Sequence, residues 1–427
     1  MKKNPKFWIA LVIFSLVGQI AWVMENMYFN VFIYKMFNAG PEAISNMVMA
    51  SAIAATVTTL LIGALSDKVG KRKLFICGGY ILWGLSILSF ALIRVDVISR
   101  FVPAAQAASV GISLVIVMDC VMTFFGSSAN DAAFNAWLTD STTPENRGAA
   151  EGINAMMPLM AILVVFGGFM SLNQDLPQTW TVIFTVIGGV VLVLGLLGFV
   201  LVQEPKVDNT GNENYFRNIF YGFRPKVIRA NPSLYLALLA YAVFGISVQI
   251  FMPYLILYYE VSLGMENYVF LFAPAIILAA VFTAFYGRVY DRKGFRASAI
   301  PVIAILMAGY VMLYFFVDTL PVFVGSLLMM CGYLSGMAVF GAILRDKTPV
   351  GKAGMFQGQR IVGQVLIPGV IGPAIGKAVL KNAELIPNND GTFSFKPNAN
   401  IFLAALAAAV VIWVAFLPLF RSLKKEQ

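Results

Sequence analysis

Long apolar runs recur along the whole chain, and this repetition constrains the fold more than any other feature. Runs long enough to cross a bilayer as helices, about twenty residues, occur six times before a polar segment at 203–231 and six times after it. None alternates like a barrel strand, so a helical bundle is the expected way to pair the backbone in lipid. The twelve runs lie near 7–34, 44–65, 74–94, 106–138, 150–171, 179–202, 232–259, 267–287, 297–317, 321–344, 355–380 and 400–420.

Composition agrees with a membrane environment. Of the 427 residues, 59% are hydrophobic and only 12% are charged, about half the charged share of a typical soluble domain. The apolar run that follows Lys6 is too long for a signal peptide and has no cleavage site after it, so we interpret it as a membrane helix. The fold class predicted is an all-α membrane protein with 12 transmembrane helices in two pseudo-symmetric six-helix bundles. The predicted domains are residues 1–202, a cytoplasmic linker at 203–231 and residues 232–427.

Basic residues set the expected orientation. Most of the 30 Lys and Arg residues fall in the loops on the side that both termini share, and such loops are usually cytoplasmic. The net charge of +9 follows from this bias and requires no nucleic-acid partner. We predict a multi-pass protein of the plasma (inner) membrane with both termini in the cytoplasm.

An internal repeat relates the two halves. A G-x-x-x-D-[KR]-x-G motif begins at Gly63 after the second predicted helix and again at Gly287 after the eighth, with basic residues following. A second match pairs Asp140 with Asp346, also at equivalent loops. We expect Gly63 to allow close helix approach and Gly70 to adopt a positive φ.

These loops resemble the cytoplasmic loop motifs of the major facilitator superfamily, and residues 140–148 resemble the conserved segment after its fourth helix. The resemblance implies two bundles that rock about a central site to give alternating access. It also implies that Asp67 lies against the start of the eleventh helix, near residues 354–357, and helps to close the cytoplasmic side. The residues predicted to act in gating are Gly63, Asp67, Gly70, Arg72, Asp140, Arg147, Glu151, Asp291, Arg292 and Arg360.

The acidic residues in helices one and four are similar to those of the glycoside–pentoside–hexuronide:cation symporters, although residues 45–65 lack the acidic pattern usual in helix two. Drug antiporters usually carry an Arg in helix four and a Gly-Pro-rich motif in helix five. Helix four here has no Arg, and a Gly-x-x-Gly-Pro-x-x-Gly run occurs at 369–376 in helix eleven instead. Symport is therefore the favoured mode.

Ionisable residues within a span are functional candidates. Asp119, in the middle of helix four, shares a helix face with Thr123 and Asn130. Because the chain has no His, a carboxylate such as Asp119 or Glu25 would have to bind Na⁺ or carry a proton; a structural, hydrogen-bonded carboxyl is the alternative for Asp119. The predicted substrate and ion residues are Trp22, Glu25, Asn26, Asp119, Thr123, Asn130, Gln249 and Gln364.

For Trp22 and Arg360 the sequence is compatible with two different roles. Trp22 beside polar groups suits a sugar, but aromatic residues equally serve bundle packing. Arg360 either contacts an anionic substrate or closes the cytoplasmic gate by pairing with a carboxylate such as Glu151. We expect Asp131 to face away from Asp119 and to belong to the cytoplasmic network.

The predicted function is secondary active transport by cation-coupled symport of a sugar or similar small polar solute. An exporter of drugs or amphipathic metabolites and an uncoupled facilitator are the alternatives, and a membrane receptor or sensor would need an output domain for which the loops are too short. The chain has no catalytic motif, and we expect no enzyme activity, no cofactor and no metal site. Its three Cys lie in apolar runs, as buried residues do. The expected partners are the solute, a coupling cation and the lipid bilayer, with the chain acting as a monomer.

Overall fold

The computed structural model describes residues 5–142, 144–169, 172–204, 220–265, 267–349, 356–388 and 391–426. Within them the chain is helical apart from one two-stranded hairpin. It divides into two compact units, Met1–Tyr215 and Phe216–Gln427.

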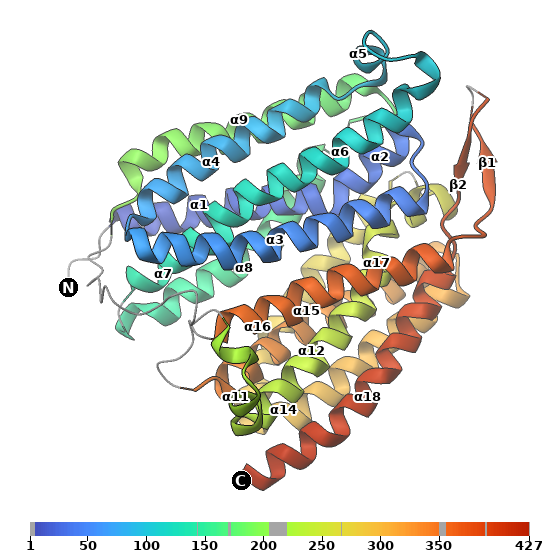
Figure 1. The fold of residues 1–427 in the computed structure, drawn as a ribbon. Helices are drawn as coiled ribbons and strands as arrows, with labels where there is room; N and C mark the ends of the chain where they lie inside the picture. Colours follow the sequence, from blue (N-terminus) through green and yellow to red (C-terminus); the bar gives the residue numbers. More distant parts are fainter. Residues whose placement is uncertain are drawn as a thin grey trace. The chain divides into compact units, whose positions relative to one another are not determined.

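The first unit consists of long helices that run alongside one another (Figure 1). The first and fourth membrane helices are each interrupted by a π-helical segment, η1 and η3. In chain order the elements are α1 (Pro5–Val23), η1 (Met24–Tyr28), α2 (Phe29–Phe37), α3 (Pro41–Val69), α4 (Arg72–Ser89), η2 (Phe90–Leu92), α5 (Val95–Ile98), α6 (Ala104–Gly126), η3 (Ser127–Phe134), α7 (Asn135–Asp140), α8 (Pro144–Phe169) and α9 (Pro177–Leu201).

The second unit is also a helical bundle, and it carries the hairpin. Its elements are η4 (Tyr221–Phe223), α11 (Pro225–Ala230), α12 (Pro232–Phe251), η5 (Met252–Tyr254), α13 (Leu255–Leu257), η6 (Tyr258–Ser262), α14 (Tyr268–Phe315), α15 (Thr319–Lys347), α16 (Gln357–Ile361), η8 (Val362–Leu366), α17 (Ile367–Val379), β1 (Leu385–Pro387), β2 (Phe393–Phe395) and α18 (Asn400–Glu426).

Proline and glycine determine where several helices begin and end. Pro41, Pro177 and Pro232 occupy the first turn of their helices, where a missing N–H is not needed. Helix α3 ends at Gly70, whose φ is 66° and whose N–H bonds to the Ser66 carbonyl at 2.9 Å. The predicted positive φ at Gly70 is confirmed.

Helix α14 joins two of the predicted spans, 267–287 and 297–317, into one element. Its backbone leaves helical geometry at Gly294, where φ is 73° and ψ is −178°. Gly294 is the counterpart of Gly70 in the repeated loop motif, and both glycines have a positive φ.

Glycines bring helices into close contact in both units. A Cβ on Gly195 of α9 would lie 2.6 Å from the backbone N of Ile81 in α4, and one on Gly309 of α14 would lie 2.4 Å from the backbone N of Met329 in α15. Small residues at such crossings are typical of helix association in lipid. At Gly63, a Cβ would meet Ala132 Cβ at 3.9 Å among the described residues, an ordinary contact. That Gly63 allows close helix approach stays a prediction.

Ten helices of the described residues are long and apolar enough to cross a membrane. This differs from the predicted twelve because α14 counts once and because the apolar part of α8, Ile153–Phe169, is shorter. Apolar side chains are exposed along α9, as lipid contact requires. The helices indicate an integral, multi-pass membrane protein. The exposed residues of α9 include Val182, Val186, Val190, Val193, Leu196, Leu197 and Val200.

Strands β1 and β2 form an antiparallel hairpin with Ile386 opposite Ser394. The Asn388 N–H donates to the Thr392 carbonyl at 2.8 Å across the turn. The prediction of an all-α protein missed this hairpin, because three-residue strands are too short to show a period in sequence.

Candidate functional site

Glu25 is a buried carboxylate in the first membrane helix. Its side chain is 7% exposed and projects from the π-helical segment η1, a kind of irregularity frequent at functional sites. Its Oε1 accepts hydrogen bonds from Thr123 Oγ1, at 2.9 Å, and from Ser51 Oγ. The Ser51 and Thr123 hydroxyl oxygens are themselves 2.9 Å apart. Three segments, η1, α3 and α6, therefore meet at one carboxylate.

Asp119 adds a second buried acid, one turn before Thr123 in α6. It is 1% exposed and interacts electrostatically with Glu25. Asp119 Oδ1 and Glu25 Oε2 have no hydrogen-bond partner among the described residues. The pair can therefore accept a proton or a cation.

An aromatic pair packs close to α6 in the same unit. The rings of Trp22 and Trp83 have centroids 5.1 Å apart and an interplanar angle of 48°. A Cβ on Gly126 would lie 2.7 Å from Trp83 and 3.0 Å from Trp22, so the glycine makes room for both rings. Trp22 Nε1 is buried and has no hydrogen-bond partner among the described residues, so its N–H is an unused donor there.

The π-helical segment η3 alters the course of the helix beyond Gly126. The Tyr80 hydroxyl lies 3.2 Å from Asn130 Oδ1 and 2.8 Å from the Phe14 carbonyl, so Asn130 is engaged with α4. Asp131 accepts from Ser127 Oγ at 3.0 Å and lies within electrostatic reach of Glu25. That Asp131 faces away from Asp119 and belongs to the cytoplasmic network stays a prediction.

The other predicted substrate residues are Asn26, which follows Glu25 in η1, and two glutamines of the second unit. Asn26 is exposed and donates from Nδ2 to the Trp22 carbonyl at 2.8 Å. Gln249 and Gln364 are half-buried residues of the second unit, in α12 and η8. Of the predicted substrate and ion residues, the structure brings together Glu25, Asp119 and Thr123.

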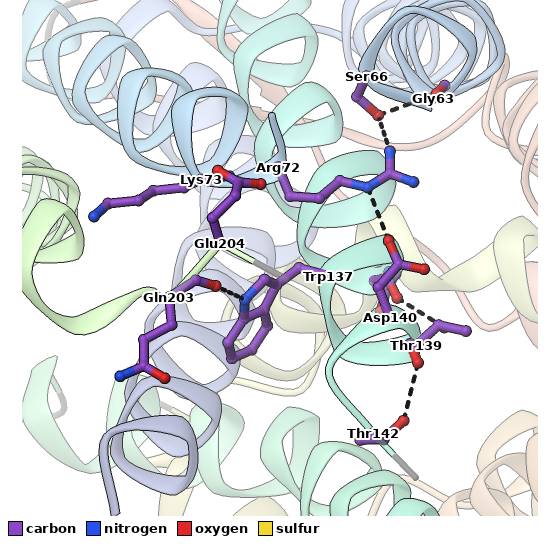
Figure 2. A network of polar contacts seen from close by, with 11 residues as sticks. Gly63, Ser66, Arg72, Lys73, Trp137, Thr139, Asp140, Thr142, Gln203 and Glu204 are labelled. Atoms are coloured by element: carbon purple, nitrogen blue, oxygen red, sulfur yellow. Dashed lines mark hydrogen bonds and ion pairs between the residues drawn. The ribbon is translucent and has the colours of Figure 1, made fainter. Parts of the chain in front are cut away.

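Figure 2 shows a polar network around Arg72, at the start of α4. Arg72 is 5% exposed, and its Nε lies 3.1 Å from Asp140 Oδ2. Its Nη1 donates to Ser66 Oγ at 2.8 Å, and the Ser66 hydroxyl donates to the Gly63 carbonyl at 3.0 Å. The ion pair therefore joins the loop motif to the last residue of α7.

In the second unit the acid equivalent to Asp140 is Asp346, and its hydrogen-bond donor is a tyrosine instead of an arginine. The Tyr290 hydroxyl donates to Asp346 Oδ2 at 2.5 Å. Asp291 and Arg292 are exposed, and the Arg296 guanidinium lies 5.4 Å from the ring centroid of Phe420. Among the described residues, Asp140 of the first unit therefore pairs with a charged donor and Asp346 of the second accepts from a neutral hydroxyl.

Some predicted gating side chains lie outside the part of the structure that is described. These are Asp67, Arg147 and Glu151. Arg360 is half-buried in α16, where its charge reaches Tyr241. Its pairing with Glu151 and its contact with an anionic substrate both stay predictions.

Ser51 and Tyr80 were not among the residues predicted from sequence. Ser51 lies in a span without charges, and most Ser residues in such helices bond only to their own backbone. Tyr80 lies among apolar residues of α4. Both side chains form hydrogen bonds to residues on other helices. Which helices pack together cannot be read from the local sequence.

Comparisons with known proteins agree with this arrangement. A search of the curated proteins found no match. A mutant form of the nucleoside transporter NupG has a similar structure, with a TM-score of 0.71, 12% identity and coverage of 96% of this chain and 99% of that one. A bacterial homologue of the human lysosomal transporter Spinster gives a TM-score of 0.70 at 14% identity, covering 99% and 98% of the two chains. The xylose transporter XylE from E. coli gives 0.67 at 12% identity, covering 95% and 96%.

At these identities the similar structures establish the fold. The family model described as Major Facilitator Superfamily matches residues 7–373, which include the repeated loop motifs, the Arg72–Asp140 pair and the buried Glu25 and Asp119. The protein is therefore a transporter and not an enzyme, and it belongs to the Major Facilitator Superfamily.

Proposed function

We propose that the protein is a secondary active transporter that works by alternating access and couples H⁺ or Na⁺ to symport of a sugar or similar small polar solute. The observation that carries this proposal is the buried pair Glu25 and Asp119. Among the described residues that carry a charge, Glu25, Asp119 and Arg72 are buried as whole residues, and Arg72 pairs with Asp140.

The physical argument rests on charge. Ionised carboxylates within a membrane are costly, and two that interact cost more still unless a cation or proton lies between them. Ser51 and Thr123 add two hydroxyl oxygens beside Glu25, and oxygen ligands suit a hard cation. Loading and unloading this pocket would change its charge and so bias the conformations between which the transporter alternates.

A polar, ring-shaped solute is supported by the Trp22–Trp83 pair, whose two indole N–H groups have no partner among the described residues. The similar structures include a nucleoside transporter and a D-xylose-proton symporter. Export of an amphipathic metabolite and uncoupled facilitation are the alternatives within the family.

The topology we propose has twelve spans in two bundles, residues 1–202 and 232–427, joined by a cytoplasmic linker at 203–231. Both termini lie in the cytoplasm of a plasma-membrane protein that acts as a monomer. The Arg72–Asp140 pair supports a gating role for the loop motif, because it holds the start of α4 to the end of α7.

The test is uptake of labelled mono- and disaccharides and nucleosides into reconstituted vesicles, with and without imposed Na⁺ or H⁺ gradients. In Glu25→Gln and Asp119→Asn we expect gradient-driven accumulation to fall about tenfold or more, since interactions of buried charged groups contribute about 1.5–3 kcal/mol. Asp318→Asn changes an exposed acid and should leave uptake unchanged. Exchange of labelled for unlabelled solute should persist in Asp119→Asn, which shows that the variant is folded.

Each other result changes the proposal in a defined way. Uptake that ignores both gradients indicates a facilitator. If no sugar or nucleoside accumulates, the solute assignment fails and amphipathic export becomes the function to test. Coupled uptake that survives Asp119→Asn returns Asp119 to a structural role.

A further inference from the structure

Residues Phe220–Ala230, here called the strap, comprise η4 and α11 and precede the first long helix of the second unit. The strap packs its inner side on protein and leaves its outer side exposed. Neither side belongs to the transport pocket described above.

The inner side of the strap contacts the start of the eleventh membrane helix. The Tyr221 and Phe356 rings meet edge-on, with centroids 5.8 Å apart and an interplanar angle of 82°. The Gly222 carbonyl accepts a hydrogen bond from the Tyr235 hydroxyl. A Cβ on Gly222 would lie 1.9 Å from Oε1 of Gln359, a side chain only 3% exposed. The strap is thus seated closely on α16.

The outer side combines apolar and basic side chains. Phe220 is 62% exposed, Phe223 40% and Ile228 38%, whereas Val227 turns inward and is 9% exposed. Exposed apolar residues and exposed basic residues are interspersed along the strap, so its outer side is both apolar and positively charged. The basic members of that surface are Arg224, Lys226 and Arg229, and all three are exposed.

This surface has the chemistry of a membrane-interface segment. Apolar side chains of such segments enter the boundary between headgroups and acyl chains, and basic ones attract anionic lipids. The position agrees, because the apolar helix α12 begins at Pro232, two residues after the strap ends. If α12 enters the membrane near Pro232, the strap lies at the level of the lipid headgroups.

We propose that the strap binds anionic phospholipids and that this binding keeps it seated on α16. The lipid surface then acts on the start of the eleventh membrane helix through Tyr221 and Gly222. The choice of the cytoplasmic leaflet rests on the proposed orientation of the transporter. The lipid binding itself does not depend on the solute, the coupling ion or the direction of transport.

The first experiment measures the depth of a nitroxide label at Phe223→Cys, with the three native cysteines replaced by alanine. Vesicles are made of phosphatidylcholine alone or with increasing phosphatidylglycerol. We expect the label to move from water to headgroup depth as phosphatidylglycerol increases. The variant Arg224→Gln/Lys226→Gln/Arg229→Gln should lose this shift. The variant Arg421→Gln/Lys424→Gln/Lys425→Gln removes three exposed charges of α18 and should retain it.

The second experiment tests the seat on α16 by the distance between labels at Phe223→Cys and Val365→Cys, the latter 37% exposed in η8. Phosphatidylglycerol should narrow this distance distribution. In Gly222→Val, which places a branched side chain where Gln359 lies, the distribution should stay broad in either lipid although the label still reaches headgroup depth.

Three results would overturn the inference. They are a label that remains in water in every vesicle, equal depth in neutral and anionic lipid, and equal loss of the shift in both charge variants. A distance distribution that ignores phosphatidylglycerol would overturn the link to α16. Because neither experiment measures transport, their failure is distinguishable from failure of the proposed symport.

Discussion

At the scale of single residues, the buried guanidinium of Arg72 at the start of α4 needs hydrogen-bond partners. Its Nε lies 3.1 Å from Asp140 and its Nη1 lies 2.8 Å from Ser66 Oγ. A buried ion pair of this kind gains little over an apolar pair, but removing one partner leaves the other charge uncompensated. Arg72 and Asp140 should therefore behave as one unit in mutagenesis.

We predict that Arg72→Gln and Asp140→Asn each lower the free energy of unfolding by about 1.5–3 kcal/mol, the range for hydrogen bonds to charged groups. The double variant should lower the free energy of unfolding little more than the more destabilising single variant does, because both single variants remove the same interaction. Reversible unfolding in mixed micelles, followed by circular dichroism, measures the cycle. Strictly additive single effects would show that the two side chains do not cooperate.

Arg94 and Asp96 provide the matched control. Their side chains also form an ion pair, with an Nε–Oδ1 distance of 2.9 Å, and the Arg94 hydrogen bond lowers the pKa of the Asp96 carboxyl. Asp96 is exposed, so water screens the pair. Asp96→Asn should change stability much less than Asp140→Asn.

At the scale of elements, π-helical segments explain why the surroundings of Glu25 could be predicted only in part. The stripe of Asp119 and Thr123 follows the α-helical period, and in the structure both side chains interact with Glu25. Asn130 and Asp131 follow the onset of η3. Because the extra residue of a π-helical turn rotates later side chains about the axis, counting in steps of 3.6 fails beyond Gly126.

Helix contacts in lipid give the prediction at this scale. Gly195→Ala on α9 should destabilise the protein by about 1–3 kcal/mol, the usual range for overpacking, because its new Cβ would lie 2.6 Å from the Ile81 backbone N, which cannot move alone. Gly189→Ala lies on the same helix, where a Cβ meets nothing within 4 Å, and should be neutral or slightly stabilising. Thermal unfolding in detergent compares them. Equal melting temperatures would mean that α4 and α9 can separate at little cost.

At the scale of the whole molecule, the sequence supports prediction of helices much better than of their partners. Apolar length alone located the described membrane helices, whereas the kink at Gly294 was found only in the structure. The hydroxyl of Ser51 beside Glu25 could not be predicted, because it depends on packing between α3 and η1. Long-range contacts of this kind leave no local period.

Orientation is the whole-molecule property that charge alone predicts, and it can be tested without a known solute. Phe101 is 84% exposed between α5 and α6, at an end of the first unit where Arg94 and Arg100 are the nearby basic residues. The positive-inside rule puts that end outside the cell and the basic end of α18 inside. With native cysteines replaced by alanine, Phe101→Cys should react with a membrane-impermeant maleimide in intact cells, and Lys424→Cys only after permeabilisation. The reverse pattern would invert the topology and place the strap and the Arg72–Asp140 pair at the outer face, whereas reaction of both residues from outside would contradict the span count between them.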